Sequence, residues 1–364
     1  MRIFISLLLI LLSLTASAKD TQKRIALLIS SYASEASPEL SYDLEELAQA
    51  YLVLHDNSTS LDIISPKGGP VLVKNNKDNL VYIQRFKSLA LDKLHNTTSV
   101  ADARYSDYDG VFIIGGGGAM MDLPTDADTQ RFLTQFANAN ATIAAVCHGP
   151  AAIVNLTLSD GRHFIAGKRV NSFTNREEQA FSAENIEQFP FLIEDKIRQN
   201  GGIFVANAPM LPFVSVDENL ITAQNPGSVA SAAEAVVVAL GQSPVAREPF
   251  KDEATLKLIS TARSTGSVTI DLALATDADK YDLNYLALYG FYAYRLAHEE
   301  DKSTELQLMQ TIGKHFQHPM FDSALIRNLH EQGSAERARQ ALRVFKQRYP
   351  EHEQVTALTA LLAS

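Results

Sequence analysis

The feature that most constrains the fold is a set of short, continuously aliphatic runs separated by amphipathic segments. The runs occupy residues 23–30, 61–65, 110–114 and 141–146. A strand that is apolar on both faces is buried on both faces, as in a parallel sheet covered by helices. Segments with helical periodicity, such as residues 43–54 and 228–240, alternate with the runs. We therefore predict an α/β fold, with a doubly wound, mostly parallel sheet of the flavodoxin type, for residues 19–241.

The character of the sequence changes after Gly241. Residues 242–250 contain two prolines and are predicted to be a linker. Residues 251–364 show helical patterns, with one candidate strand at residues 268–273. Residues 333–350 are similar to the second helix of a tetratricopeptide-type hairpin. A stable solenoid needs several repeats, and the sequence shows only one. We therefore favour an ordinary small helical bundle for the C-terminal region.

Residues 1–18 have the pattern of a secretory signal peptide. Met1 and Arg2 precede an apolar stretch, and the small residues Ala16 and Ala18 close the segment. The stretch is shorter than the roughly 20 residues that span a bilayer. We expect cleavage after Ala18 and export to the periplasm. An uncleaved N-terminal membrane anchor is the alternative.

The charged and metal-ligating residues exclude several classes of function. The chain has 32 basic and 42 acidic residues, a net charge of -10, and no basic stripe, so we expect no nucleic-acid partner. Its nine histidines are scattered, with no H-E-x-x-H or paired-cysteine spacing, so we expect no metal and no other cofactor. With a single cysteine there is no intrachain disulfide, and a lone thiol is either buried and inert or reactive.

That cysteine stands where a predicted strand turns into a predicted helix. Ala145 and Gly149 lie two positions before and after Cys147, and Pro150 begins the helix. Small neighbours let the backbone bend sharply, as around the serine of G-x-S-x-G enzymes. The helix N-terminus and the adjacent His148 would both favour the thiolate. We therefore predict that Cys147 is a nucleophile; the alternative is a small buried residue at the end of a core strand.

Four glycines, at residues 115–118, follow another buried strand and lie at the same edge of the sheet as Cys147. A dinucleotide-binding fingerprint that began at Gly115 would need glycine at position 120, where the chain has Met120. A phosphate-binding P-loop would need a Lys-Ser/Thr pair, which the loop lacks. The loop is therefore better suited to contact a substrate directly than to bind a nucleotide.

Five segments together resemble the ThiJ/PfpI superfamily of class I glutamine-amidotransferase-like proteins. They are AVCHGPAA at residues 145–152 and the segments at residues 41–54, 62–70, 107–124 and 220–237. The resemblance covers residues 22–241 and is strongest to the branch that contains heat-shock chaperones and glyoxalase III enzymes. In that branch a histidine directly follows the nucleophilic cysteine, as His148 follows Cys147. The C-terminal region lies outside the resemblance.

The resemblance implies a role for a carboxyl group beside the sulfur. Cys147 would be the nucleophile, and Glu46 matches the family's acidic residue. Close to a thiolate and partly buried, Glu46 would have a raised pKa and could donate a hydrogen bond. Glu45 would not share this role, because neighbouring residues on a helix do not share a face. The alternative for Glu46 is an ordinary solvated helix glutamate.

The resemblance also implies a carboxylate that orients His148. In the related branch an acidic residue follows a Phe-Thr segment, which corresponds here to residues 172–180. Glu178 fits that spacing best, and Glu177 is the second choice. Such a carboxylate would fix the imidazole tautomer, as in other Cys-His-acid sites.

Gly117 and Gly118 match the family's oxyanion loop, whose backbone N–H groups would bind a developing negative charge. Many relatives have a histidine where this chain has Gly117, and a glycine where it has Ser41. These departures bear on substrate specificity, because both positions help to shape the pocket.

By resemblance, the chain would be a cysteine-dependent enzyme that acts on a small reactive carbonyl compound. The expected reaction converts methylglyoxal to lactate, as in glyoxalase III or deglycase enzymes (a lyase of the D-lactate dehydratase type). Alternatives are an amidase or peptidase, a redox-responsive chaperone or binding protein active in stress, and an inactive relative. True amidotransferase chemistry is not expected, because residues 200–240 contain no His-x-Glu. A homodimer, and a protein partner for the C-terminal helices, remain open.

Overall fold

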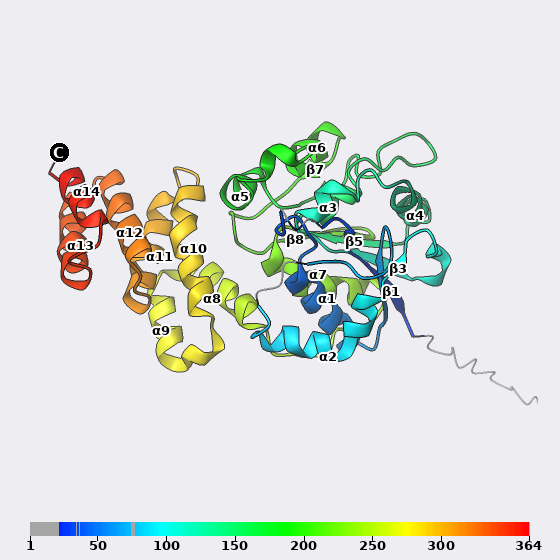
Figure 1. The fold of residues 1–364 in the computed structure, drawn as a ribbon, viewed down its shortest axis with the longest axis horizontal. Coiled ribbons are helices and arrows are strands. Elements are labelled where there is room, and N and C mark those ends of the chain that lie inside the picture. The colour runs from blue at the N-terminus through cyan, green and yellow to red at the C-terminus, as the bar shows by residue number, and fades with distance from the viewer. Residues whose placement is uncertain (1–21, 34, 36, 74–76, 364) are drawn as a thin grey trace, which may run out of the picture.

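The computed structural model describes residues 22–33, 35, 37–73 and 77–363. The molecule is elongated: a sheet flanked by helices forms one end, and the helices after residue 250 extend from it to the C-terminus (Figure 1). The predicted signal peptide, residues 1–18, lies outside the described residues. In the described part, no helix has both the length and the apolar character needed to cross a membrane.

The core of the larger part is one seven-stranded sheet. The strands of the chain are β1 (Arg24–Leu28), β2 (Ser60–Ser65), β3 (Thr98–Ser99), β4 (Gly110–Ile113), β5 (Thr142–Val146), β6 (Arg169–Val170), β7 (Ile203–Phe204), β8 (Val214–Asp217) and β9 (Leu220–Ala223). The sheet has the order β3-β2-β1-β4-β5-β9-β8, while β6 and β7 pair separately. Its neighbouring strands run parallel except β8, which is antiparallel to β9. The predicted doubly wound, mostly parallel sheet is therefore confirmed.

Helices cover both faces of this sheet. Those of the α/β part are α1 (Leu44–Asp56), α2 (Val81–His95), α3 (Gly118–Met121), α4 (Ala127–Asn138), α5 (Asn175–Phe181), α6 (Ile193–Gln199) and α7 (Val229–Ala239). One apolar cluster joins α1, α2 and α7 to one face, and a second joins α3, α4 and α6 to the other. Figure 1 shows these two layers below and above the sheet. The continuously apolar strands are thus buried on both sides.

The C-terminal region is helical throughout its described length. Its helices are α8 (Lys251–Thr265), α9 (Val268–Asp277), α10 (Leu283–Leu296), α11 (Lys302–His315), α12 (Pro319–Glu331), α13 (Ala335–Arg348) and α14 (Gln354–Leu361). Consecutive helices pack in pairs, α10 on α11 and α12 on α13. The candidate strand at residues 268–273 was wrong. Ile270 and Leu274 are buried one helical turn apart, whereas Leu272, which would share their face in a strand, is 64% exposed.

Residues 186–200 have a helical sequence pattern, but only part of the segment forms the α-helix α6. A 3₁₀ turn at Ile186–Gln188 is separated from α6 by Pro190, which cannot donate a backbone hydrogen bond. The helix expected after Cys147 is a single 3₁₀ turn, Gly149–Ala152. This second difference bears on the chemistry of the cysteine.

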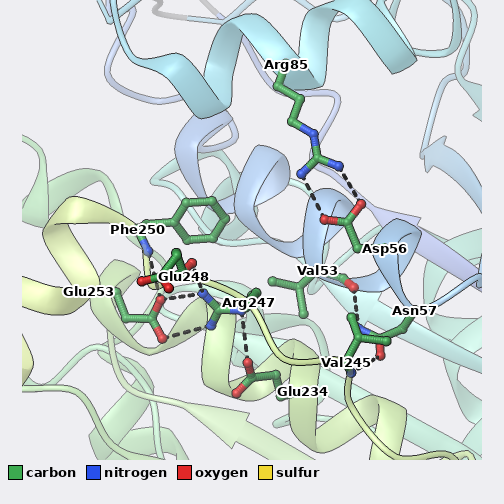
Figure 2. Close-up of polar contacts among 10 residues, drawn as sticks. All are labelled: Val53, Asp56, Asn57, Arg85, Glu234, Val245, Arg247, Glu248, Phe250 and Glu253. Atoms are coloured by element: carbon green, nitrogen blue, oxygen red, sulfur yellow. Dashed lines mark hydrogen bonds and ion pairs between the residues drawn. The ribbon is translucent and has the colours of Figure 1, made fainter.

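The segment predicted as a linker, residues 242–250, is bonded to both parts of the molecule (Figure 2). The guanidinium of Arg247 contacts Glu234 of α7 at 2.9 Å and Glu253 of α8 at 2.7 Å. Nearby, the backbone N–H of Val245 donates to Asn57 Oδ1, at the end of α1, at 2.8 Å. These contacts fix the start of α8 against α1 and α7.

The helical region also touches α5. Arg176 donates to the carbonyl of Leu296 at the end of α10, at 2.7 Å. The rings of Phe181 and Tyr292 pack with their centroids 4.8 Å apart. The C-terminal helices are therefore anchored on two elements, α1 and α5, that border the cysteine.

Candidate active site

Cys147 lies on a sharp turn at the carboxyl end of β5. Its φ angle is 55°, in the left-handed region that non-glycine residues seldom adopt. Its N–H donates to Ala223 O at 2.8 Å and its carbonyl accepts from Phe173 N at 2.9 Å, so both backbone groups are bonded. A Cβ at Gly149 would lie 2.6 Å from Ile113 O, which explains the small residue there. A strained conformation held by its surroundings is typical of functional positions.

His148 and Glu178 complete a line of polar groups from the sulfur. The Cys147 Sγ lies 3.2 Å from His148 Nδ1, and His148 Nε2 lies 2.8 Å from Glu178 Oε1. The second contact has the length of an ion pair, although its alignment falls short of a good hydrogen bond. Burial alone would raise the pKa of Glu178, but His148 outweighs it and the pKa is lowered. An ionised Glu178 favours the tautomer with its proton on Nε2, which leaves Nδ1 to accept the thiol proton.

Glu177, the second choice in the sequence, has a different position. Its carboxyl accepts from Thr174 N at 3.0 Å, from Met210 N at 2.8 Å and from Asn225 Nδ2 at 3.0 Å. Burial raises its pKa, and these donors act in the opposite direction. It caps α5 and ties it to residues 207–225, so the structure brings Glu178, and not Glu177, to His148.

Glu46 lies on the other side of the sulfur. Asp43 caps the N-terminus of α1, and Glu46 lies buried in the first turn of this helix. The Oε2 atom of Glu46 accepts a hydrogen bond from Gly115 N at 2.8 Å. The other oxygen, Oε1, is buried without a nitrogen or oxygen partner, and the carboxyl is within hydrogen-bonding reach of the Cys147 thiol. Burial, and next the charge of Asp43, raise the pKa of Glu46 well above its usual range. Glu45, by contrast, pairs with Lys77 at the surface.

The surroundings of Cys147 do not favour a resting thiolate, contrary to the expectation from the sequence. Burial, and next the charge of Glu46, raise the pKa of the Cys147 thiol. The residue is 4% exposed. The expected helix N-terminus is a single 3₁₀ turn, so little macrodipole acts on the sulfur. A protonated Glu46 removes the repulsion and can donate a hydrogen bond to the sulfur once the thiol proton has left.

The glycine loop contacts the cysteine through a residue that the sequence did not single out. A Cβ on Gly115 would lie 2.8 Å from Cys147 Cβ, so only glycine fits there. Gly118 N donates to Ser41 O at 3.0 Å and is therefore already bonded, which argues against its predicted oxyanion role. Within the described chain, the N–H groups of Gly117 and His148 donate no hydrogen bond. The N–H that follows a nucleophile is a common oxyanion donor, and this rule could have identified His148 N.

A cavity of about 240 Å³ adjoins the site. Its lining includes Glu46 and Phe173, and also Asp252, Tyr285 and Leu288 from the C-terminal helices. No sequence pattern linked these last residues to the cysteine, because the fold brings them together from more than a hundred positions away. In the described residues, no group of three or more His, Cys, Asp or Glu side chains has the arrangement of a metal site.

The raised pKa of Glu46 predicts a pH dependence of stability. The folded protein retains the Glu46 proton to higher pH than the unfolded chain does, so its free energy of unfolding falls as pH rises above about 4.3 toward the folded-state pKa. Glu46→Gln removes this loss. We expect the variant to gain on the wild type by about 1.4 kcal/mol for each pH unit in that window. Urea unfolding at pH 5 and pH 8 measures it; parallel pH profiles for the two proteins would contradict the assignment.

A flavodoxin-like sheet with a cysteine, a histidine and a glutamate at its carboxyl edge is a scaffold for cysteine-based catalysis or sensing. Residues 23–239 match the model of the DJ-1/PfpI family. The chain belongs to this family, as the resemblance to ThiJ/PfpI proteins predicted. The helices after residue 250 lie beyond the match.

Known relatives include proteins named as glyoxalases. A probable glutathione-independent glyoxalase of Schizosaccharomyces pombe is 32% identical over 150 residues, 40% of this chain and 68% of the relative. Glyoxalase 3 of Candida albicans is 30% identical over 40% of this chain and 64% of its own length. The alignments thus span about two thirds of these relatives. The crystal structure of a 24-kDa Rapid Encystment Protein of Francisella tularensis is 27% identical, with a TM-score of 0.56 over 60% of this chain and 99% of that one.

Proposed function

We propose that this protein is a glutathione-independent glyoxalase that uses Cys147 to convert methylglyoxal and water to lactate. The observation that carries the proposal is the position of the sulfur between two proton carriers. Nδ1 of His148 lies 3.2 Å away on one side, and the carboxyl of Glu46 reaches the sulfur from the other. Isomerising a hemithioacetal requires protons to move at two neighbouring carbons, and this arrangement supplies two groups to move them.

The first half of the reaction forms the carbon–sulfur bond. The thiol proton passes to His148 Nδ1, and the sulfur of Cys147 attacks the aldehyde carbon of methylglyoxal. The aldehyde oxygen, as it gains negative charge, takes the proton of Glu46. Backbone N–H groups of Gly117 and His148 stabilise that charge before the transfer. The product is a hemithioacetal, with a carboxylate on Glu46 and a proton on the imidazole.

The second half moves hydrogen between the two carbons. Glu46 removes the proton from the sulfur-bearing carbon while His148 protonates the neighbouring carbonyl oxygen, which gives an enediol. Glu46 returns its proton to the second carbon, and His148 accepts the hydroxyl proton, so a lactoyl thioester forms on Cys147. Water then hydrolyses the thioester to lactate and restores the thiol. The net reaction adds one water and leaves the oxidation state of the protein unchanged.

The test is a product assay without glutathione. Purified protein is incubated with methylglyoxal, and lactate is measured with enzymes specific for its D and L forms. We expect lactate of one configuration, D by analogy with D-lactate dehydratases. If methylglyoxal is not consumed, or if racemic lactate forms at the uncatalysed rate, the proposal fails.

A second candidate is hydrolysis of amides or peptides, which the Cys147–His148–Glu178 arrangement favours because it matches the order of groups in acyl-transfer sites. Release of a chromophore from small amide substrates would support this alternative, provided that Glu178→Gln suppresses it.

A further inference from the structure

We propose that the cavity between the α/β part and the C-terminal helices is the substrate pocket, and that it admits carbonyl compounds that are uncharged or carry a protonated amine while rejecting carboxylates. This inference rests on the proposed function and specifies its substrate class. It also gives the C-terminal helices a role, because they supply one wall of the pocket.

The cavity is connected to the reacting groups through two of its lining residues. Glu46 is within hydrogen-bonding reach of the Cys147 thiol, and the ring of Phe173 lies 4.8 Å from that of His148. One wall comes from α8 and α10 and contains Asp252, Tyr285 and Leu288. A cavity of about 240 Å³ is near the lower limit of small-molecule sites, which suits a compound of a few carbon atoms.

The two parts of the molecule are joined at this cavity by polar contacts. Gln49 of α1 donates to Asp252 Oδ2 of α8 at 2.7 Å, directly in the lining. Thr255 Oγ1 accepts from the backbone N–H of Asp282 at 2.9 Å, which fixes the start of α10 beside α8. These hydrogen bonds therefore hold the wall that carries Tyr285 in a fixed position against α1.

The charges in the lining oppose an anionic ligand. Five of the lining residues are acidic: Asp43, Glu45, Glu46, Glu177 and Asp252. Glu46 is neutral in the resting site, so the other four supply the negative charge. Among the described lining residues the cation is Lys77, which is already paired with Glu45. A carboxylate ligand would meet no free positive partner here, whereas an aldehyde or ketone needs none.

Two observations beyond the net charge of the lining point to a ligand. The lining residue Glu46 is buried and has an oxygen, Oε1, without a nitrogen or oxygen partner. In the wall formed by α10, no hydrogen bond joins the hydroxyl of Tyr285 to another residue of the described chain. Burial, and then the charge of Asp252, raise the pKa of Tyr285, so its hydroxyl remains a donor that a carbonyl oxygen can accept.

The test uses the single cysteine as a probe and does not require turnover. Rates of alkylation of Cys147 by iodoacetamide, which is neutral, and by iodoacetate, which is anionic, are compared in the native protein and in the chain unfolded in urea. Because both reagents need the thiolate, the ratio of the rates cancels the thiol pKa. We expect the native ratio to exceed the unfolded ratio by about tenfold or more.

Matched variants test whether the selectivity against iodoacetate arises in the cavity. Asp252→Asn should lower the native ratio several-fold, whereas Asp271→Asn, on α9 and paired with Lys314 and His315, should not change it. A native ratio equal to that of the unfolded chain, or equal effects of the two variants, would overturn the inference.

Turnover provides a second readout. We expect Tyr285→Phe to raise KM for methylglyoxal by about five- to tenfold with little change in kcat. We also expect 4-carboxyphenylglyoxal to be a much poorer substrate than phenylglyoxal, which has the same reacting carbonyl groups without the carboxylate. Equal kcat/KM for phenylglyoxal and 4-carboxyphenylglyoxal would contradict the inference while leaving the glyoxalase proposal intact. Conversely, if methylglyoxal is not converted but the alkylation ratio is high, the proposed function fails and the selectivity of the pocket stands.

Discussion

Replacing Cys147 by alanine should reduce lactate formation from methylglyoxal by at least about 10³-fold. The reason is that the sulfur forms the covalent bond on which both proton transfers depend. Removing a small side chain from this buried turn costs little packing, since Cys147 and alanine differ by one atom. The measurement is kcat/KM by product assay, with circular dichroism and the melting temperature as controls for folding.

Cys147→Ser is the matched control, because it retains the hydrogen-bonding geometry but supplies a much weaker nucleophile. It should be nearly as inactive as the alanine variant. If either variant forms lactate at the wild-type rate, the cysteine is not the nucleophile. In that case the sensor or chaperone interpretation, which needs no covalent substrate, gains support.

Neighbouring glutamates on α5 should respond to substitution in opposite ways. Glu178→Gln should lower kcat by about 10²-fold or more, because the amide cannot stabilise an imidazolium on His148. Glu177→Gln should lower the free energy of unfolding by about 1–3 kcal/mol. The carboxylate of Glu177 accepts hydrogen bonds from three N–H donors, and the NH₂ group of a glutamine would face one of these donors without an acceptor. Steady-state kinetics and urea unfolding of both variants separate the two effects.

Each of these two variants serves as the control for the other, because Glu177 and Glu178 are adjacent in the sequence and both are buried. Loss of kcat in Glu177→Gln at a temperature where the variant is fully folded would mean that the orienting carboxylate has been misassigned. Unchanged kcat in Glu178→Gln would show that the Glu178–His148 contact has no part in catalysis.

Local pattern was sufficient to predict the scaffold and the position of the cysteine. Continuous apolar runs indicated buried parallel strands, and Ala145 and Gly149 indicated the bend that the structure shows at Cys147. The choice of Glu178 over Glu177 came from the family resemblance, in which an acidic residue follows a Phe-Thr segment, and the structure brings Glu178 to the imidazole. These features depend on residues close together in the sequence.

The remaining features depend on tertiary contacts that local pattern does not encode. The elevated pKa of the thiol follows from burial, which a sequence does not display. The hydrogen bond from Gly118 N to Ser41 O depends on how two loops meet. The wall formed by Tyr285 and Asp252 depends on the packing of α8 and α10, far along the chain. Propensity likewise failed at residues 268–273, where packing among helices decided the structure.

The central claim is that methylglyoxal forms a covalent bond to Cys147 before its hydrogen atoms move. Intact-protein mass spectrometry after a brief exposure to methylglyoxal, with peptide mapping, tests this most directly. Glu46→Gln should accumulate one adduct on the peptide that contains Cys147, because the bond forms but the proton transfer is slow, and Cys147→Ala should form none there. Adducts confined to lysine and arginine side chains, in equal amounts in both variants, would contradict the account.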